Sequence, residues 1–388
     1  MMYYLFPILF GFFYSFNRKR FKIDDKVKNI IEKFCIYFSV FIFCGGYMTG
    51  SDWVSYELIY NDFNIDAFSK IDKEPAFYLL VLLFKFLGFS FFFFLIIMKI
   101  LVFFIIVRFL KKYSKDRFLL SFSVFLCTNA LFIFVDNPLR YMIALGIVVL
   151  ALDFLIRRKL AYFITLVLLA SMFHISSIIV IIAYFFRIQK LSNLKIFFIY
   201  LILTIAWTPK NIINIIDTFP AWLNFLIGSY YRRFIEEQNN SYFSIGWFFT
   251  HFLFLFILFN RKKIISSSSF GVTVFNMSIL YFFLVATVGL IPTFFRVPIY
   301  FAVFLYIALA VSLDDLFAKN ILIKLFFVLY MILANVKNIY STYVYIPYSS
   351  YFIHLFKIDL PYEYRIQYNK NEYFKRTGEA PPEYIPSE

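Results

Sequence analysis

The sequence predicts an all-α fold, a polytopic integral membrane protein with roughly ten to twelve transmembrane helices, re-entrant or interfacial helices and an outward-facing cavity. Of its 388 residues, 62% are hydrophobic, 24% are aromatic and only 16% are charged. A soluble domain is about half apolar and about a quarter charged, so this chain has too few polar residues to cover a water-facing surface. A soluble enzyme is therefore excluded. A disordered chain is excluded too, because disorder requires low hydrophobicity.

The formal net charge of +15 would suggest a nucleic-acid partner in a soluble protein. In membrane proteins, however, Lys and Arg accumulate in the cytoplasmic loops and orient the helices. We therefore expect no nucleic-acid partner. The cysteines and histidines are scattered singly and show no metal-ligand spacing, so the sequence predicts no metal site and no cofactor. These residues are Cys35, Cys44, Cys127, His174, His251 and His354.

Apolar stretches near the length of about 20 residues that a bilayer requires predict the transmembrane helices in order. They are Met2–Phe16, Ile30–Met48, Phe91–Leu110, Phe118–Val135, Leu139–Ile156, Leu194–Trp207, Ile245–Phe259, Ile265–Leu290, Val297–Val311 and Ile321–Val336. The first is followed by Arg18, Lys19 and Arg20 rather than preceded by them. It is therefore expected to be a retained span with its N-terminus outside, not a cleavable signal peptide.

Basic clusters predict the cytoplasmic side of the membrane. They are Arg18–Lys28, Lys111–Arg117, Arg157–Lys159, Arg187–Lys195 and Arg261–Lys263. The loops 49–74 and 208–244 are then expected at the outer face. Residues 1–337 are expected to form a single polytopic membrane domain, and residues 338–388 an extramembrane tail with a disordered end.

Two apolar stretches conflict with a simple crossing. Pro75–Phe89 lies between an outer loop and a span that must end inside, so we expect a re-entrant or interfacial helix. Leu160–Phe186 has basic clusters at both ends, which predicts a broken or hairpin element around His174. Non-helical backbone at membrane depth requires a cover of protein or a water-filled cavity. Both stretches therefore indicate a cavity.

Two acidic clusters border the outer side. If residues 52–60 are helical, Asp52, Tyr56 and Tyr60 share one face, and a carboxylate with two phenols can bind sugar hydroxyls and accept a proton from one. The alternative is a solvated loop with interfacial tyrosines. Glu74 precedes Pro75 and suits a helix N-cap with proline at the first helical position. Since Glu is not a favoured cap, a functional carboxylate is equally open.

Asn137, Pro138 and Arg140 predict the start of a helix, with Asn137 as the cap and Arg140 in the first turn. A cation there opposes the helix dipole, which favours a bound anion held by Arg140 and the free N–H groups. The alternative is an arginine that reaches the lipid headgroups. In a helix, His174 would share a face with Ser171 and Ser177. This predicts either a substrate-contacting histidine with Ser177 or a buried histidine satisfied by the serines.

Arginines on the outer side depart from the positive-inside trend. Arg232, Arg233 and Arg296 all fall on this side, and with Arg140 they could surround a pyrophosphate. Arginine suits this role because its planar guanidinium offers a fork of donors.

The order of these motifs resembles the EpsG-like branch of the Wzy-type polysaccharide polymerases, bacterial inner-membrane enzymes that polymerise O-antigen or capsule repeat units. Asp-Trp…Tyr…Tyr is followed by Glu-Pro with an apolar run, Leu-Arg-x-x-x-Ala, Phe-His-x-Ser and a late Phe-Arg-x-Pro, over about Thr49–Pro298. Ala76 replaces the glycine expected after Glu-Pro, and Tyr141 replaces a frequent glutamine. These departures concern fine specificity.

The resemblance implies a metal-independent glycosyltransferase, without a cofactor, at the periplasmic face of the inner membrane. Its donor would be a glycan on undecaprenyl pyrophosphate and its acceptor a lipid-linked repeat unit, with membrane lipid, a chain-length regulator and a flippase as partners. Asp52 or Glu74 would serve as the base. Arg140 and Arg296, with Arg232 and Arg233, would bind pyrophosphate, and His174 would contact acceptor or phosphate.

Two other functions stay open. A lipid-linked oligosaccharide flippase would show internal pseudo-symmetry and cationic residues deep within its spans, whereas the charges here lie at one face, which favours an enzyme. A membrane O-acyltransferase that modifies the polysaccharide would use a histidine within the membrane, and His174 keeps that function open.

Overall fold

The computed structural model describes residues 2–21, 24–65, 74–206, 218, 245–287, 295–319, 321–341, 343–345, 348–356 and 362–377. Within these ranges every regular element is helical, which confirms the predicted all-α class. The one departure among the described residues is an isolated antiparallel bridge between Gly46 and Ser350.

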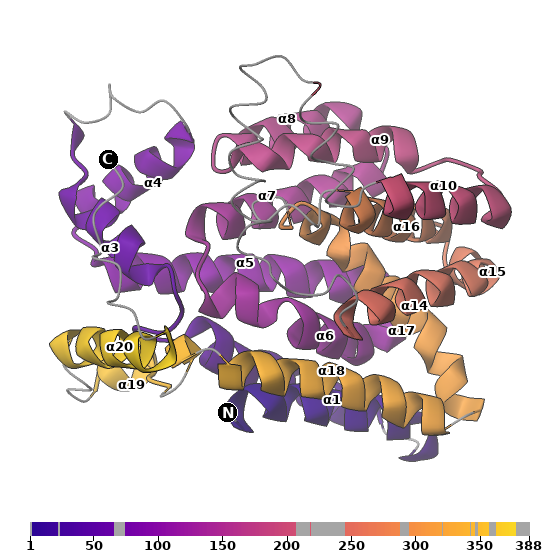
Figure 1. Ribbon diagram of the computed structural model, residues 1–388, viewed down its shortest axis with the longest axis horizontal. Helices are drawn as coiled ribbons and strands as arrows, with labels where there is room; N and C mark the ends of the chain where they lie inside the picture. The colour runs from indigo at the N-terminus through magenta and orange to yellow at the C-terminus, as the bar shows by residue number, and fades with distance from the viewer. Residues whose placement is uncertain are drawn as a thin grey trace.

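Four helices form the centre of the molecule, with α5 between α7 and α6 (Figure 1). They are α5 (Phe91–Ser114), α6 (Phe118–Thr128), α7 (Leu139–Ile156) and α17 (Ala302–Lys319). Ser90 is the N-cap of α5, and its hydroxyl accepts a hydrogen bond from the Phe93 N–H. Helix α7 packs on one side of α5, and α6 with α17 on the other. The side chains between these helices form the buried apolar core.

Two outer layers cover this centre. On one side α8 (Leu160–Ser171) and the 3₁₀ segment η5 (Ile175–Ile182) pack against α7, and α9 (Ala183–Phe186) packs against η5 and α16 (Gly271–Thr287). On the other side lie α1 (Met2–Phe21), α2 (Asp25–Ser39) with the π-helical turn η1 (Val40–Cys44), and α18 (Ile321–Ser341). Because α18 continues to Ser341, the expected domain end at residue 337 falls inside a helix.

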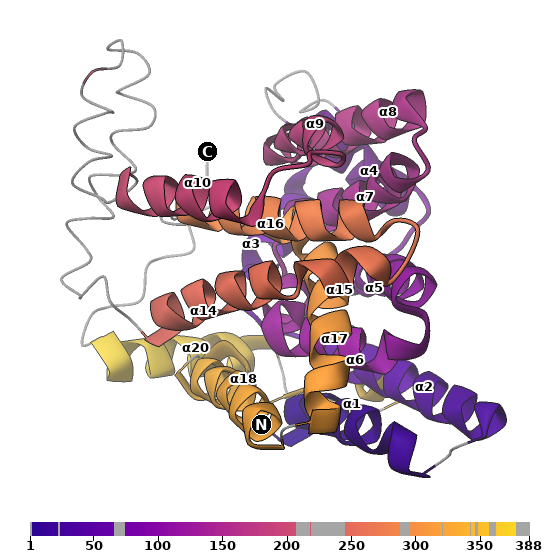
Figure 2. The ribbon, with the colours of Figure 1, turned by 90° about the vertical axis from the view of Figure 1, so that its right-hand side faces the viewer.

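Figure 2 shows α17 running across the layers, while a second group of helices lies beside it. These are α10 (Asn193–Ala206), α14 (Ile245–Phe259), α15 (Arg261–Ser266) and α16 (Gly271–Thr287). The span expected over Ile265–Leu290 is therefore divided into α15 and α16. The division occurs at a turn through four residues of the serine-rich segment before Gly271. Serines compete for backbone hydrogen bonds and favour turns.

Short helices gather at one end of the molecule (Figure 1). They are α3 (Trp53–Asp62), α4 (Pro75–Phe86), α19 (Tyr351–His354) and α20 (Tyr362–Thr377), and η8 (Tyr343–Tyr345) packs against α20. The 3₁₀ turn η7 (Pro298–Phe301) instead precedes α17 and packs against α16. Helix α4 has 12 residues and is about 18 Å long, less than the roughly 30 Å of a bilayer core. It is too short to cross a membrane alone, and the re-entrant or interfacial helix expected over Pro75–Phe89 stays a prediction. Its Lys85 ammonium donates to the carbonyls of Asn61 and Phe63 and so ties α4 to the end of α3.

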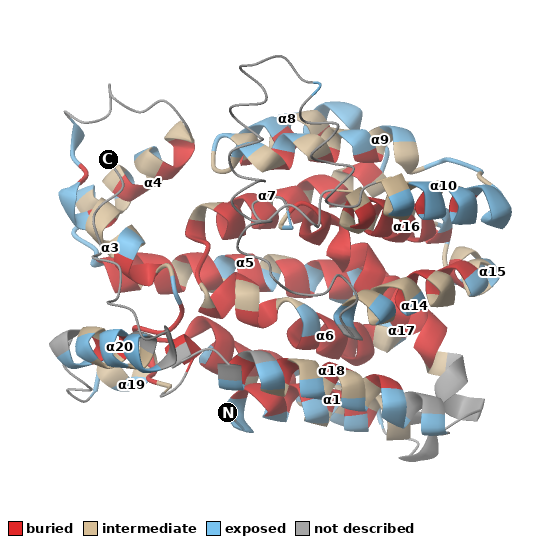
Figure 3. Ribbon diagram, viewed as in Figure 1, coloured by how far each residue is buried: buried red, intermediate tan, exposed pale blue. Residues whose placement is uncertain are grey.

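Two stretches in the described part of the chain are long and apolar enough to cross a membrane, Phe91–Thr128 and Leu139–Ile156. Shorter apolar helices of 10–17 residues accompany them. The outer helices α8, α10 and α18 carry many exposed residues (Figure 3), and large apolar ones are among them, such as Leu169, Ile202 and Leu329. Such exposure is unfavourable in water but suits contact with lipid.

Candidate active site

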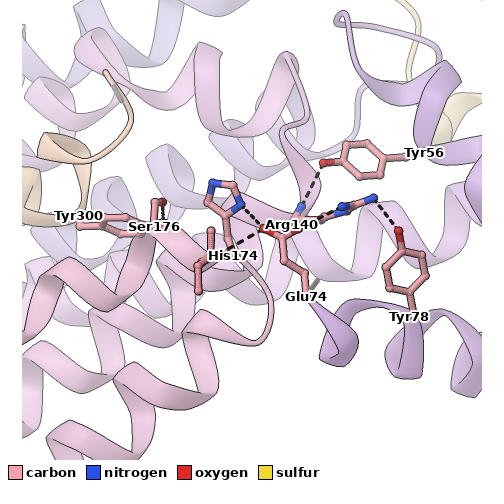
Figure 4. Close-up of polar contacts among 8 residues, drawn as sticks. Tyr56, Glu74, Tyr78, Arg140, His174, Ser176 and Tyr300 are labelled. Carbon is pink, nitrogen blue, oxygen red and sulfur yellow. Dashed lines mark hydrogen bonds and ion pairs between the residues drawn. The ribbon is translucent and has the colours of Figure 1, made fainter. Parts of the chain in front are cut away.

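Glu74 lies at the N-cap of α4, with Pro75 at the first helical position as predicted. Its carboxylate does not cap the helix. Instead Oε2 accepts a hydrogen bond from Arg140 Nη1 at 3.0 Å, and Oε1 lies 2.8 Å from His174 Nδ1 and 3.3 Å from the Ile175 N–H (Figure 4). An ionised carboxylate only accepts, so the protonated Nδ1 of His174 donates. Glu74 thus joins three segments that are far apart in the sequence.

Arg140 occupies the first turn of α7, as predicted, but the start of the helix differs from the prediction. Pro138 is the N-cap. Asn137 has a left-handed backbone with φ of 63° and turns its amide to the Thr49 carbonyl at 2.7 Å, so it does not cap the helix. The Asn137 amide therefore holds the segment at Thr49 and does not cap the N-terminus of α7.

The guanidinium of Arg140 is enclosed by aromatic rings. Its Nη2 donates to the Tyr78 hydroxyl at 3.1 Å, and its carbon lies 5.1–5.9 Å from the ring centres of Tyr56, Phe77 and Tyr78. The Tyr56 hydroxyl also accepts the Arg140 backbone N–H at 3.5 Å. An arginine that only reached for headgroups would not have a carboxylate and three rings around it. The geometry therefore argues against the headgroup alternative, but the anion that Arg140 contacts is Glu74 of the same chain, so a bound anion at Arg140 stays a prediction.

His174 lies where the stretch 160–186 breaks, as the sequence predicted. Helix α8 ends at Ser171, and His174 has an extended backbone before η5 begins. The Met172 carbonyl accepts the Ala76 N–H at 3.2 Å, which fixes this break against α4. The edge of the Tyr141 ring meets the His174 ring at 5.7 Å between centroids. With Nδ1–H donated to Glu74, Nε2 carries the acceptor lone pair of the imidazole, and it has no hydrogen-bond partner among the described residues.

The prediction that Ser171, His174 and Ser177 share a helical face is wrong, because the helix does not continue through His174. The Ser171 hydroxyl donates to the Leu168 carbonyl. The Ser177 side chain is fully buried, and its hydroxyl has no hydrogen-bond partner among the described residues. The neighbouring Ser176 is hydrogen-bonded, because its hydroxyl lies 3.1 Å from the Tyr300 hydroxyl.

A second acidic centre is formed by Asp52, the N-cap of α3, and Asp136. Asp52 accepts a hydrogen bond from the Ser51 hydroxyl at 2.8 Å, and its N–H donates to the Asp136 carbonyl at 3.1 Å. The carboxylate of Asp136 accepts from the Tyr345 hydroxyl at 2.8 Å. Sequence reasoning did not select Asp136 or Tyr345. Asp136 could have been found as the carboxylate beside Asn137, whereas Tyr345 has no local signal.

Arg296 lies near Asp52 and Asp136. Its carbonyl accepts the Tyr141 hydroxyl at 2.9 Å, and its guanidinium lies 5.6 Å from the ring centres of both Phe132 and Phe295. Its positive charge acts on Asp52 and Asp136. Among the described residues it forms no ion pair, and its Nε is buried without a hydrogen-bond partner.

The carboxylates, all in connecting segments, differ in protonation. Burial alone would raise the pKa of Glu74, but the hydrogen bonds from His174 and Arg140 outweigh it and leave that pKa below its usual value. Burial raises the pKa of Asp52 despite Ser51 and Arg296. Burial also raises the pKa of Asp136 to about 7, against the Tyr345 hydrogen bond. Glu74 is therefore a stable anion, and Asp136 titrates near neutrality.

The structure thus brings Glu74, Arg140 and His174 together, with Tyr56 beside them. Tyr60 lies elsewhere: its hydroxyl donates to the Phe89 carbonyl at 2.7 Å. Tyr78 and Tyr141 join the site without having been predicted as site residues. Tyr78 could have been found from its place four residues after Glu74 on one helix. The predicted Arg232 and Arg233 lie outside the described residues.

The comparison with known proteins agrees with the order of these motifs. No curated protein and no solved structure is similar enough to match this chain. The sequence profile of the EpsG family matches residues 29–350. This range includes Asp52, Glu74, Asp136, Arg140 and Arg296. This match covers most of the chain, which therefore belongs to the EpsG family.

Proposed function

We propose that this EpsG-family membrane protein is a polysaccharide polymerase. It joins oligosaccharide repeat units carried on undecaprenyl pyrophosphate into O-antigen, capsule or exopolysaccharide of the Wzy type. The observation that carries the proposal is the network around Glu74. Its partners Arg140 and His174 lie 66 and 100 residues away in the sequence. A carboxylate, an oriented imidazole and a guanidinium in one place supply the groups that glycosyl transfer from a pyrophosphate requires.

In the proposed reaction His174 is the general base. Glu74 holds Nδ1–H, orients the ring and stabilises the imidazolium that forms, which is the role of the carboxylate in other such dyads. Nε2 takes the proton of the acceptor hydroxyl as its oxygen bonds to the anomeric carbon of the donor sugar. The bond from that carbon to the pyrophosphate oxygen breaks, and the leaving group keeps the electron pair.

We assign Arg296 to the leaving pyrophosphate, because it forms no ion pair among the described residues and its Nε is buried without a hydrogen bond. Arg140 already binds Glu74 and Tyr78, so it positions the carboxylate and shares in phosphate binding through its remaining donors. Arg232 and Arg233 are proposed as further phosphate contacts. Asp52, close to Asp136, is the alternative base, and Tyr56 is a sugar contact.

The location is also part of the proposal: the bacterial inner membrane, crossed many times, with the site and its cavity at the periplasmic face. Arg140 and Arg157 are 17 positions apart at opposite ends of α7. That separation is about 26 Å, close to the roughly 30 Å of a bilayer core. The basic clusters of α5 and α7 therefore lie a membrane thickness away from the Glu74 network, which supports a periplasmic site.

The test uses a strain that lacks this gene and carries Glu74→Gln or His174→Gln at matched protein level. Asp62→Asn, an exposed carboxylate at the end of α3, is the control. We expect single repeat units on the acceptor lipid with both site variants and a full glycan ladder with the control. Undelivered repeat units would instead indicate a flippase. Full-length chains that lack acetate would indicate an O-acyltransferase.

A further inference from the structure

A separate cavity of about 210 Å³ lies between the C-terminal halves of α5 and α7. Its apolar wall includes Ile105, Phe109 and Leu150. Asp153, on its rim, is 13 positions after Arg140 on the same helix. That separation is about 20 Å, so the cavity is distinct from the Glu74 site and lies toward the opposite end of α7.

The rim of the cavity is strongly cationic. Arg108, Lys112 and Arg157 face one carboxylate, Asp153, so three positive charges against one negative charge leave two in excess. Asp153 is fully engaged. It binds the Lys112 ammonium, accepts the Tyr113 hydroxyl at 2.5 Å and pairs with Arg157 at 2.7 Å. Asp153 therefore cannot also neutralise Arg108.

Arg108 is the cation left over. It is exposed, and among the described residues it has no hydrogen-bond or ion-pair partner. Lys112 and Arg157 are also 38% and 46% exposed, so they retain donors for a ligand. The rim can therefore bind an anion without breaking an existing pair.

Size and apolar surface narrow the class of anion. Pockets for small molecules are usually about 300–1,000 Å³, so this cavity is too small for a glycan and fits a head group. Leu101, Ile105, Arg108 and Lys112 follow one another on one face of α5, and Leu101 is exposed. An apolar stripe thus leads from the surface of the helix to the cations. A lipid can place its acyl chain along that stripe and its phosphate at the rim, whereas a free ion uses the rim alone.

We infer that this cavity binds the phosphate head group of an anionic phospholipid from the surrounding bilayer. The site is independent of the polymerase proposal and requires only that α5 and α7 face lipid. Basic pockets between membrane helices bind anionic head groups in the same way. Cations at helix C-termini are also favoured by the helix dipole, but the dipole does not account for the cavity or the apolar stripe beside them.

The test measures lipid selectivity of the full chain in phosphatidylcholine vesicles that contain spin-labelled phosphatidylglycerol or spin-labelled phosphatidylcholine. We expect the wild type to immobilise phosphatidylglycerol preferentially. Arg108→Gln should reduce this preference about fivefold, from about 1 kcal/mol per cation near an anionic lipid at 1.4 kcal/mol per tenfold change. Lys262→Gln removes an equal charge from an exposed position on α15 and should leave the preference unchanged.

Three outcomes would overturn the inference. No preference in the wild type means that no such lipid site exists. An equal loss in Arg108→Gln and Lys262→Gln means that the attraction is diffuse. Saturable binding of millimolar inorganic phosphate that Arg108→Gln removes, without any preference for the labelled anionic lipid, means that the rim binds free phosphate. Because Arg108 is exposed, the variant should keep the unfolding temperature of the wild type, and this is checked in the same samples.

Discussion

Replacement of Glu74 by Gln tests whether one carboxylate organises the site. Glu74 receives hydrogen bonds from Arg140, His174 and the Ile175 N–H, and its side chain is only 9% exposed. Gln keeps one carbonyl oxygen but presents an NH₂ group to a donor on the other side. At least one buried donor then loses its acceptor, which costs about 1–3 kcal/mol. Since the Arg140 side chain is 24% exposed, we expect the lower half of this range.

The same substitution should remove a pH-dependent part of the stability. The folded-state pKa of Glu74 is lowered, so its contribution is present above the usual glutamate value of about 4.3. That contribution is lost as the pH falls through the lower folded-state value. Glu74→Gln should therefore lower the unfolding temperature at neutral pH and lessen its fall on acidification. Activity should fall by about 10²- to 10⁴-fold, because His174 loses its orienting anion.

A double-mutant cycle separates pairing from independent damage. Unfolding temperature and glycan ladder length are measured for Glu74→Gln, Arg140→Gln and the double variant, with Asp62→Asn as the exposed control. Residues in one hydrogen-bond network couple by about 0.5–3 kcal/mol, so the double variant should be less damaged than the sum of the singles. Strict additivity, together with a normal ladder in Glu74→Gln, would refute the central role of this carboxylate.

Three further substitutions test other parts of the structure. Asp136→Asn should flatten the dependence of the stability on pH between about 4 and 7. Burial raises the pKa of Asp136 to about 7, so its contribution to the stability is lost as the pH rises through that value. An unchanged pH profile would contradict this prediction. Arg296→Lys should slow polymerisation about tenfold or more, because an ammonium lacks the planar fork of donors. Arg158→Lys, at an exposed position, is the control and should not slow it. Equal glycan ladders in the two variants would contradict the assignment of Arg296 to the pyrophosphate. Lys99→Met should raise the unfolding temperature. The Lys99 ammonium is fully buried without a hydrogen-bond partner among the described residues, and an unsatisfied buried donor costs about 1–3 kcal/mol. A lower unfolding temperature would contradict this prediction.

Much of the helical order could be predicted because the apolar stretches are bounded by charges and prolines. Leu139–Ile156 and Ile245–Phe259 have the predicted bounds, and the break at His174 followed from a conflict between two basic clusters. Continuous spans were harder to predict. The stretch Ile30–Met48 changes to a π-helical turn at Val40, and π-turns depend on tertiary packing more than on composition.

The sequence predicted the main residues of the site, but not which of them contact one another. Arg140 was expected to face an anion from outside, yet it binds Glu74 of the same chain. Tyr345 reaches Asp136 across 209 positions. It comes from the tail that was expected to be extramembrane, and nothing in the local sequence marks such a contact. The end of that tail, residues 378–388, lies outside the described residues.

Two strained backbone positions explain how the site is assembled. Glu74 and Asn137 both have left-handed φ values, 60° and 63°, and each precedes a proline, which further restricts its backbone. A non-glycine residue in this conformation costs on the order of 1 kcal/mol or more. Glycine would remove the cost at either position, but it would also remove a side chain that the structure uses.

At Glu74 the left-handed backbone turns the carboxylate away from its own helix end and toward Arg140 and His174. At Asn137 it turns the amide away from α7 and toward the Thr49 carbonyl, which fixes the loop that carries Asp52 against the start of the helix that carries Arg140. The two helix starts thus give up ordinary side-chain caps so that their polar groups can join separate segments. Glu74→Gly should therefore relieve local strain and still abolish polymerisation, whereas relief of strain with retained activity would show that the backbone, not the carboxylate, is what the site requires.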